Sequence, residues 1–289
     1  MTVRFAKYQG TGNDFVLVLD PSGERPFTAA EIAALCDRRF GVGADGVIRV
    51  TGEGSDAAPF FMDYVNADGS RAEMCGNGIR CVAALLYDEG LAPGEAFPIG
   101  TRAGTKLVEL DVREGRLAGV AVEMGTPAFT LASIPMRGPA WERFLAEPIE
   151  LGPGWVAKAS AVSMGNPHLV VFLDDDPERV QVAHVGAALE HDPRFPEGTN
   201  VEFAQVRGDR IVARVWERGS GETMACGSGA CAVAVAANEA GLVPRSTVVA
   251  FPGGELSIER REDGSVRLFG PAARVFSGEV DPERLRGSR

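Results

Sequence analysis

Short apolar runs separated by turn residues are the main hydrophobic pattern of this chain. Runs rich in Val, Phe and Leu, bounded by Gly, Pro and Asp, are typical of strands. One helix signal stands between them, because Thr28 and Glu31 have the spacing of a capping box and the segment from Ala30 to Arg39 follows it. The pattern predicts an α+β fold with early strands at Val3–Phe5, Phe15–Leu19, Val47–Val50 and Phe60–Val65.

Two further helix signals each begin at a cysteine that precedes Gly-x-Gly. They are "EMCGNGIRCVAALLYDEGLAP" and "MACGSGACAVAVAANEAGLVP". In both segments a glycine, Gly90 or Gly241, is expected to end the helix, and a proline stands three residues later. The pattern therefore places Cys75 and Cys226 at the N-termini of two equivalent helices.

The similarity between the two halves of the chain extends beyond these helices. The stretch "GNDFVLVLD" from Gly12 resembles "GNPHLVVFLD" from Gly165, and "RRFGVGAD" from Arg38 resembles "PRFPEGTN" from Pro193. Such a repeat predicts two similar α+β domains, with the segment Gly125–Pro135 as a linker. Because clefts between domains are preferred sites for small ligands, we expect the ligand between the two domains.

Length and charge limit the class of protein. A chain of 289 residues is expected to form about two domains. Its net charge of −11 argues against nucleic acid or an anionic membrane as the main partner. The sequence shows neither a membrane-spanning apolar run nor the pattern of a signal peptide, so we expect a cytoplasmic protein whose five cysteines are thiols. A small molecule is the expected partner.

A cysteine at a helix N-terminus is suited to acid–base chemistry. The unpaired N–H groups and the positive end of the helix dipole stabilise an anion by about 0.3 to 2 kcal/mol, which lowers a thiol pKa of about 8.5 by as much as about 1.5. Two such groups, one thiolate and one thiol, can flank one carbon, so that one removes a proton and the other donates a proton from the opposite side. Inversion of a stereocentre needs this pair, and a duplicated domain supplies it.

Other interpretations of the cysteines explain less. Cys36, Cys81 and Cys231 are expected to be buried apolar residues inside helices. A zinc site is an alternative, but the spacings of Cys75 to Cys81 and of Cys226 to Cys231 are not the usual short ligand spacings. A cysteine hydrolase with a histidine partner is another, but it leaves the second cysteine unexplained. The available histidines are His168, His184 and His191.

The lysines argue against a pyridoxal phosphate enzyme. Such a racemase must hold its cofactor on a lysine. The three lysines, Lys7, Lys106 and Lys158, lie outside the matched segments, and the chain carries no Walker-type phosphate loop. We therefore expect an enzyme that works without a cofactor and without a metal.

Four motifs, "NADGSRAEMCGNGIRC", "SMGNPH", "GTN" and "ERGSGETMACGSGAC", together resemble the diaminopimelate epimerase family, and the similarity runs from "GTGNDF" to "GPAARVF". The resemblance implies a cofactor-independent isomerase that interconverts L,L- and meso-diaminopimelate for lysine and peptidoglycan biosynthesis. It also implies two pseudo-symmetric domains, each a curved sheet wrapped around a central helix, with the active site in the interdomain cleft. The expected domains are 1–125 with a returning segment 271–289, and 126–270. A homodimer is a family-level expectation.

The resemblance further implies a role for each matching residue. Cys75 and Cys226 match the acid–base pair, and His168 and Glu217 match residues that tune the pKa of these thiols. Glu217 and Arg218 also match the pair that recognises the distal ammonium and carboxylate, in agreement with the bidentate geometry of arginine. The other substrate-binding positions are Asn13, Asn66, Asn166 and Asn200, and the carboxylate-gripping backbone donors Gly76, Asn77, Gly227 and Ser228.

One departure and two alternatives accompany the resemblance. Many family members carry glutamine where this chain has Gly46, which has no side chain to contact a substrate. A two-cysteine racemase of another amino acid, such as proline or histidine, is an alternative, but proline has no distal charged group for Glu217 and Arg218. A non-catalytic amino-acid-binding relative is a second alternative, against which both cysteines argue.

Overall fold

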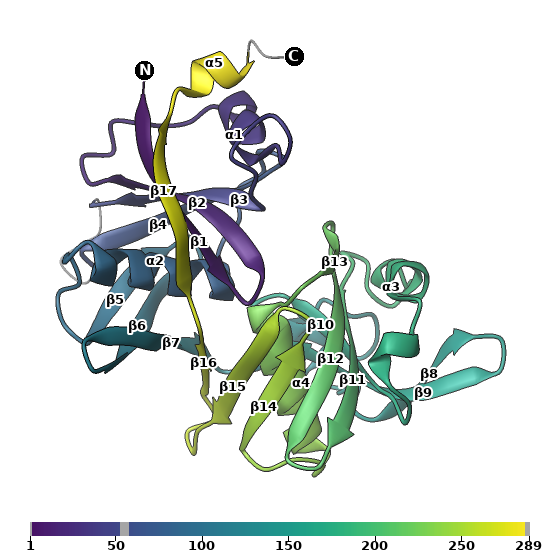
Figure 1. Ribbon diagram of the computed structural model, residues 1–289. Coiled ribbons are helices and arrows are strands. Elements are labelled where there is room, and N and C mark those ends of the chain that lie inside the picture. Colours follow the sequence, from purple (N-terminus) through teal and green to yellow (C-terminus); the bar gives the residue numbers. More distant parts are fainter. Residues whose placement is uncertain (1, 53–57, 287–289) are drawn as a thin grey trace. The chain divides into compact units, whose positions relative to one another are not determined.

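The computed structural model describes residues 2–52 and 58–286. The chain forms two compact units, one comprising Met1–Val122 with Gly270–Arg289 and the other Glu123–Phe269 (Figure 1). Within the described ranges, no helix has the length and apolar character needed to cross a membrane. Both units combine strands with helices, so the predicted α+β class is confirmed.

The first unit is built on a mixed sheet in the order β17-β1-β2-β3-β4-β5-β6-β7. Two neighbouring pairs, β2/β3 and β4/β5, are parallel, and the helices α1 (Ala29–Cys36) and α2 (Gly76–Asp88) make the crossovers that parallel pairing requires. The strands are β1 (Val3–Gly10), β2 (Asn13–Asp20), β3 (Gly46–Thr51), β4 (Phe60–Asn66), β5 (Ala96–Thr101), β6 (Gly104–Arg113), β7 (Arg116–Gly125) and β17 (Ala273–Val280).

The second unit repeats this plan in the order β8-β9-β10-β11-β12-β14-β15-β16, with the short β13 also beside β12. Its parallel pairs are β10/β11 and β12/β14, and the helices α3 (Val182–Glu190) and α4 (Gly227–Glu239) lie in the two crossovers. The strands are β8 (Glu147–Gly152), β9 (Trp155–Ser163), β10 (Pro167–Phe172), β11 (Asn200–Arg207), β12 (Arg210–Glu217), β13 (Gly221–Thr223), β14 (Ser246–Phe251), β15 (Gly254–Arg260) and β16 (Val266–Gly270).

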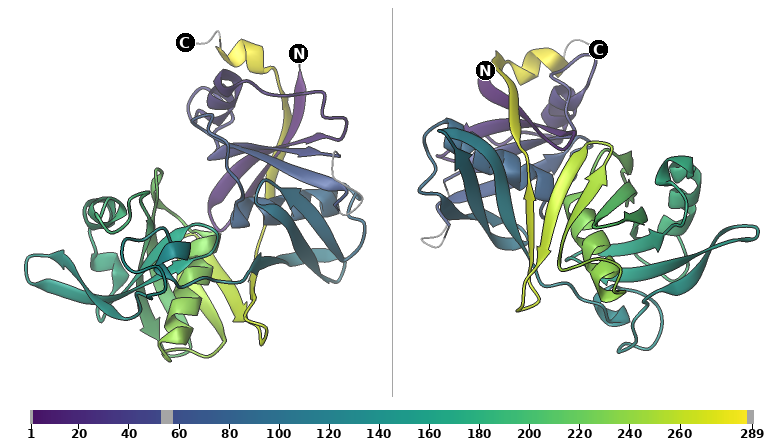
Figure 2. Two further views of the ribbon diagram at one scale, coloured as in Figure 1. Left: turned by 180° about the vertical axis from the view of Figure 1, so that it is seen from behind. Right: turned by 60° about the horizontal axis from the view of Figure 1, so that its bottom comes forward.

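The succession of parallel and antiparallel pairs is the same in both units, so the predicted duplication is confirmed. Strand β17 occupies in the first unit the place that β8 occupies in the second, antiparallel to the next strand of the sheet. The last strand of the chain therefore lies beside β1, as both views of Figure 2 also show, and a short helix α5 (Pro282–Arg286) follows it. Residues 287–289 of the expected returning segment lie outside the described residues.

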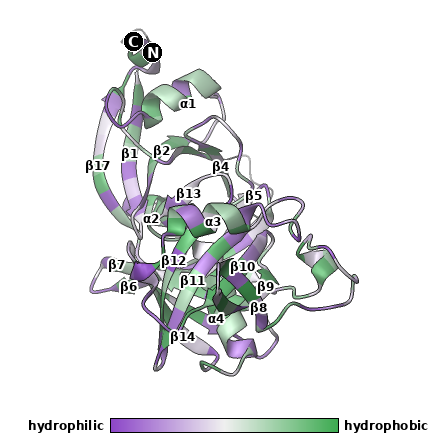
Figure 3. Cartoon of the chain, turned by 90° about the vertical axis from the view of Figure 1, so that its right-hand side faces the viewer, coloured by the Kyte–Doolittle hydropathy of each residue, from purple (hydrophilic) through white to green (hydrophobic). Residues whose placement is uncertain are grey.

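Each unit encloses one helix that is buried on nearly all sides. In α2 every residue from Gly76 to Leu86 is buried, and in α4 the same is true from Gly229 to Ala237. Helix α2 contacts strands β1 to β4, β6 and β17, and α4 contacts β9 to β11, β14 and β15. In Figure 3, α4 and the strands around it carry much of the colour of hydrophobic residues. A helix without a polar face is typical of a core position, so each sheet wraps around its helix.

Both central helices end in a Schellman motif. Gly90 and Gly241 have φ values of 68° and 70°, and the leucine after each glycine donates its N–H back to the last turn of the helix. The helices therefore end two residues before the predicted glycine, at Asp88 and Glu239. Helix α1 begins at the predicted Thr28 cap and ends at Cys36, short of the expected Arg39.

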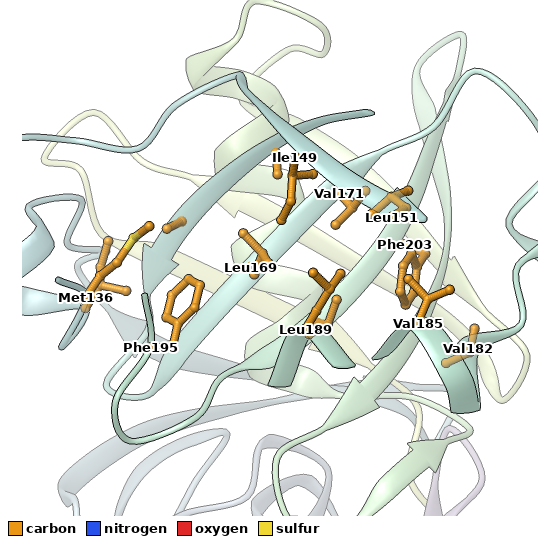
Figure 4. Packing of buried hydrophobic residues seen from close by; sticks show 14 of the residues in the cluster. Met136, Ile149, Leu151, Leu169, Val171, Val182, Val185, Leu189, Phe195 and Phe203 are labelled. Carbon is orange, nitrogen blue, oxygen red and sulfur yellow. The ribbon is translucent and has the colours of Figure 1, made fainter. Parts of the chain in front are cut away.

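The second unit has a further core on the other side of its sheet, where α3 packs. Val182, Val185 and Leu189 of α3 lie against Leu169 and Phe203 of the sheet (Figure 4). Residues near the start of the second unit complete this core, since Leu131, Ile134 and Met136 are buried in it. The prediction of a plain linker at Gly125–Pro135 is therefore wrong, because part of this segment is packed against the second unit.

We expect Gly241→Ala to lower the free energy of unfolding by about 1 kcal/mol, because an L-residue with a side chain is disfavoured at positive φ. A Cβ atom at this position meets nothing within 4 Å, so the cost is conformational and not steric. Gly241→Asn is the matched control, since asparagine tolerates this backbone region better. Urea unfolding measures the difference, and equal stability of the alanine and wild-type proteins would contradict the assignment.

Candidate active site

The sulfur atoms of Cys75 and Cys226 cap the two central helices. Each cysteine is the N-cap residue, and its Sγ accepts the backbone N–H of the third helical residue, Gly78 or Gly229, at 3.4 Å. N-cap side chains satisfy N–H groups that have no partner inside the helix. The predicted position of both cysteines at helix N-termini is confirmed, and the two sulfur atoms have the same local geometry.

Asn13 connects the first cysteine to its surroundings. Its Oδ1 lies 3.6 Å from Cys75 Sγ and accepts a hydrogen bond from Asn77 Nδ2 at 3.3 Å. Its Nδ2 donates to Asp45 Oδ2 at 2.5 Å. Because the carboxylate of Asp45 can only accept, it fixes the amide of Asn13 with the oxygen towards the sulfur.

A charged network holds Asp45 in place. Arg38 donates to Asp14 and to Asp45, with both shortest contacts at 2.7 Å, and Lys7 Nζ lies 2.7 Å from Asp14 Oδ2. Burial of Asp14 opposes ionisation, but the hydrogen bonds from Arg38 and Lys7 outweigh it and lower the pKa of Asp14 to about 2. The backbone leaves the helical conformation at Asp37, with φ −59° and ψ 120°, so Arg38 lies outside α1.

A fully buried arginine supports the start of α2. Arg80 donates to Gly76 O at 3.0 Å, to Thr11 Oγ1 at 3.2 Å and to Pro271 O at 3.2 Å. Thr11 in turn donates to Asn77 Oδ1 at 3.4 Å. The predicted backbone donors Gly76 and Asn77 are thus positioned by residues that the sequence analysis did not identify.

Cys226 lies in a more buried and more acidic environment. Its Sγ is 3.5 Å from Ser228 Oγ, and Glu217, which accepts a 2.5 Å hydrogen bond from Thr223, is close enough to affect it. Burial, together with the charges of Glu217 and Glu202, raises the pKa of the Cys226 thiol well above its usual value. The expectation that the helix N-terminus lowers a thiol pKa is therefore wrong for Cys226, because burial exceeds the dipole effect.

The remaining predicted residues of the second unit form a hydrogen-bonded chain. His168 Nε2 lies 3.0 Å from Asn166 Oδ1, and His168 Nδ1 lies 2.7 Å from Oε1 of Glu202, which the sequence analysis missed. Asn200 donates to Pro167 O and accepts the N–H of Arg218, both at 2.9 Å. Glu202 had a sequence signal, since a charge inside the apolar run "NVEFA" is typical of a functional position.

These networks do not include Asn66, Gly46 or the side chain of Arg218. The exposed Arg218 donates to Glu197 O at 3.0 Å, and Asn66 donates to Ser70 Oγ at 3.0 Å. At Gly46 a Cβ atom would lie 2.5 Å from the Tyr64 ring and 2.6 Å from Val65 O. No side chain fits there without a shift of the backbone, so the absent glutamine has a structural reason in this chain.

The other three cysteines are buried, as predicted. Burial raises the pKa of the Cys36 and Cys81 thiols to about 12, which keeps both in the unreactive thiol form. Within residues 2–52 and 58–286, His, Cys, Asp and Glu side chains form no group of three or more that could hold a metal ion.

The fold is that of a class of solved two-unit proteins that includes racemases and epimerases. A probable proline racemase from Agrobacterium radiobacter K84 superimposes with a TM-score of 0.69 at 16% identity, covering 96% of this chain and 93% of that one. A phenazine biosynthesis protein of the PhzF family from Bacillus anthracis gives a TM-score of 0.68 at 16% identity, covering 97% and 99%. At such identities the likeness shows the fold alone.

Sequence comparison identifies the family within this class. The signature of diaminopimelate epimerase matches residues 5–130 and 160–275. Diaminopimelate epimerases from Pelotomaculum thermopropionicum and Leptospira biflexa are 46% and 41% identical, covering 96% and 97% of this chain and 98% and 100% of their own lengths. The chain belongs to the diaminopimelate epimerase family, and it is an isomerase.

Glu217→Gln is expected to stabilise the protein at about pH 8. Burial raises the pKa of Glu217, against the hydrogen bond from Thr223, so the folded chain holds this proton more tightly than the unfolded chain. Stability is therefore lost as pH rises from the ordinary value of 4.5 through the raised pKa. Glutamine removes the charge and keeps an acceptor for Thr223.

Thermal unfolding at several pH values tests this expectation. The gain in Tm should shrink as pH falls towards about 4, where the carboxyl group is protonated in both states. Glu222→Gln is the control, because Glu222 is partly exposed and paired with Arg214. A gain at Glu217 that does not depend on pH would contradict the assigned cause.

Iodoacetamide at about pH 7.5 is expected to label Cys75 before Cys226. Cys75 is the one cysteine of the five that is not buried, and the raised pKa of Cys226 keeps that group as the less nucleophilic thiol. Peptide mapping over time gives both rates. Faster labelling of Cys226 would show that its environment in solution is not the acidic, buried one described above.

Proposed function

We propose that this protein interconverts L,L- and meso-diaminopimelate with Cys75 and Cys226 as an acid–base pair: one sulfur atom removes the α-proton, and the other donates its own proton to the opposite face. The observation that carries the proposal is the identical capping geometry of the two sulfur atoms, each 3.4 Å from a helix N–H group. Membership of the family, with relatives named diaminopimelate epimerase along nearly the full chain, supports the same substrate.

The reaction needs one sulfur atom in each protonation state on opposite sides of the α-carbon. A thiolate removes the α-proton, the electron pair stays on the carbon as a carbanion, and the other thiol donates its proton to the opposite face. The raised pKa of Cys226 supports its role as the thiol in the resting enzyme. Cys75, whose Sγ donates to Asn13 Oδ1 at 3.6 Å, gives up this proton when it acts as the base. After one turnover the thiol and the thiolate have exchanged places, so the enzyme is in the protonation state that reacts with the opposite epimer.

Substrate recognition follows from the groups around each sulfur atom. The backbone N–H groups at Gly76–Asn77 and Gly227–Ser228 lie at helix N-termini, where a carboxylate is stabilised and the developing charge on the α-carbon can be spread onto it. Arg218, whose guanidinium is exposed, is the proposed anchor for the distal carboxylate.

The proposed contacts of the other residues complete this picture. Glu217 has two proposed roles, since it binds the distal ammonium group and tunes the pKa of Cys226. His168 tunes the pKa of the two cysteine thiols. Neutral contacts with the substrate come from the amide side chains of Asn13, Asn66, Asn166 and Asn200.

The proposal also covers the pathway, the cofactor requirement, the location and the assembly of the enzyme. It acts in lysine and peptidoglycan precursor synthesis without pyridoxal phosphate or metal. A cytoplasmic location follows from the need for reduced thiols, and a homodimer is part of the proposal. The two domains proposed are 1–125 with 271–289 and 126–270, and the limits of the compact units support them.

Incubation with pure L,L-diaminopimelate, followed by chiral analysis, tests the function. The protein is first dialysed against a chelator and hydroxylamine, and the meso isomer is expected to form without additions. Absence of the meso isomer, or activity that returns only with pyridoxal phosphate or zinc, would overturn the proposal.

Cys75→Ala and Cys226→Ala are each expected to abolish epimerisation, because either the base or the opposite acid is lost. Each variant should exchange the α-hydrogen of one epimer with deuterated water, with retention, since the remaining thiol acts on its own side. The favoured epimer should differ between the two variants. Mass spectrometry of both epimers reads out the exchange.

Cys81→Ala and Cys231→Ala are the matched controls, because they change buried cysteines on the same two helices. Both controls should epimerise normally. Near-normal epimerisation by either Cys75→Ala or Cys226→Ala would rule out the two-base mechanism.

A further inference from the structure

A buried histidine–glutamate pair lies below the first turn of α4. His168 on β10 and Glu202 on β11 both have 0% of their surface exposed, and Nδ1 and Oε1 are 2.7 Å apart. Among the described residues, Oε2 of Glu202 has no hydrogen-bond partner. Burying an acid with one oxygen unsatisfied is costly, so this pair calls for an explanation other than packing.

The first unit shows that the fold does not need such a pair. In the β2/β3 ladder Phe15 pairs with Gly46, just as His168 pairs with Asn200 in β10/β11. Ile48 stands two residues after Gly46, as Glu202 stands two residues after Asn200. The duplicated scaffold therefore holds Phe15 and Ile48, both fully buried, where the second unit holds His168 and Glu202.

The glycine of each helix cap confirms this equivalence. A Cβ atom on Gly78, the third residue of α2, would lie 2.9 Å from Ile48 Cδ1. A Cβ atom on Gly229, the third residue of α4, would lie 2.7 Å from Glu202 Oε1. Ile48 and Glu202 thus fill the same space against the turn that the cysteine caps, one with a methyl group and the other with a carboxyl group.

The hydrogen bonds of the pair have one consistent direction. Asn166 Oδ1 can only accept, so His168 Nε2 donates across the 3.0 Å contact. The 2.7 Å contact between Nδ1 and Glu202 Oε1 is a second hydrogen bond. Glu202 therefore lets both ring nitrogens of His168 be satisfied while Nε2 keeps its proton.

We propose that Glu202 is a positioning residue of the epimerase: through His168 it fixes the amide of Asn166 with its oxygen inward and its NH2 group towards the substrate. The proposal rests on the proposed function, in which Asn166 contacts diaminopimelate. It also explains an asymmetry of the repeat. Asp45 holds the equivalent Asn13 the other way, with its oxygen towards the sulfur of Cys75.

A double-mutant cycle tests the route through Asn166. Glu202→Gln loosens the choice of tautomer, because a glutamine side chain can either donate to Nδ1 or accept from it, and Asn166→Ala removes the amide. Each single change is expected to lower the affinity for L,L-diaminopimelate about tenfold or more, as for the loss of one hydrogen bond. The double variant should be no weaker than the weaker single variant. Additive losses would overturn the proposal.

The first unit supplies a second variant that separates function from folding. His168→Phe combined with Glu202→Ile copies the Phe15–Ile48 pair into the second unit. We expect it to fold with a Tm equal to or above that of the wild type, since apolar replacement of a buried polar pair is often neutral or stabilising, and to lose affinity and turnover. Wild-type activity would show that the pair does not position Asn166, and failure to fold would show that the pair serves packing. Either result would overturn the proposal.

Nitrogen-15 NMR of the imidazole rings tests the tautomer without any substrate. The chain has three histidines, so His184→Gln and His191→Gln assign the spectrum. The resonance of His168 Nε2 should be that of a protonated nitrogen in the wild-type protein, and an unprotonated Nε2 would overturn the proposal. If the wild type neither binds nor epimerises diaminopimelate, the proposed function fails, and this measurement still decides the orientation assigned to Glu202 and His168.

Discussion

The hydrogen bond from a buried helix terminus to a cysteine sulfur atom is the constraint on which the rest of this structure depends. The first N–H groups of a helix have no partner inside the helix, and a side chain at the N-cap satisfies one of them. Cys75 and Cys226 provide that cap. Glycine at the third helical position allows the sheet side chains to approach closely, because a Cβ atom there would lie 2.9 Å from Ile48 Cδ1 in α2 and 2.7 Å from Glu202 Oε1 in α4. In the proposed function, structural capping and chemistry use the same atom.

The duplicated scaffold gives the two sulfur atoms one geometry and two electrostatic environments. Around Cys75 the polar partner is a neutral amide, Asn13, held by an acidic group that Arg38 neutralises. Around Cys226 the neighbours are carboxyl groups in a buried site, and they raise the pKa of the thiol. The proposed two-base mechanism needs one acid and one base at rest. The two caps are equal, so the difference between the two sulfur atoms comes from their neighbours and their burial.

Local signals in the sequence are sufficient to predict the repeat, the Thr28 cap and the two cysteine caps, because each depends on residues within a few positions. The residues that orient the predicted site residues cannot be predicted in this way. Arg80 meets Pro271, and Glu202 meets His168, only after strands distant in sequence have paired. The predicted direction of the pKa shift of Cys226 was also wrong. The sequence shows that this cysteine begins a helix, but it does not show how deeply the thiol is buried.

Gly46 illustrates how the scaffold limits the choice of substrate contacts. It follows Asp45, which holds Asn13, and its Cα faces the ring of Tyr64, which packs edge-on against Phe15 at 5.5 Å between ring centres. A glutamine side chain at this position would clash with that ring and with Val65 O. The aromatic packing therefore favours a bare backbone at Gly46. In the proposed function, polar recognition on this side falls to Asn13, whose orientation depends on its hydrogen bond to Asp45.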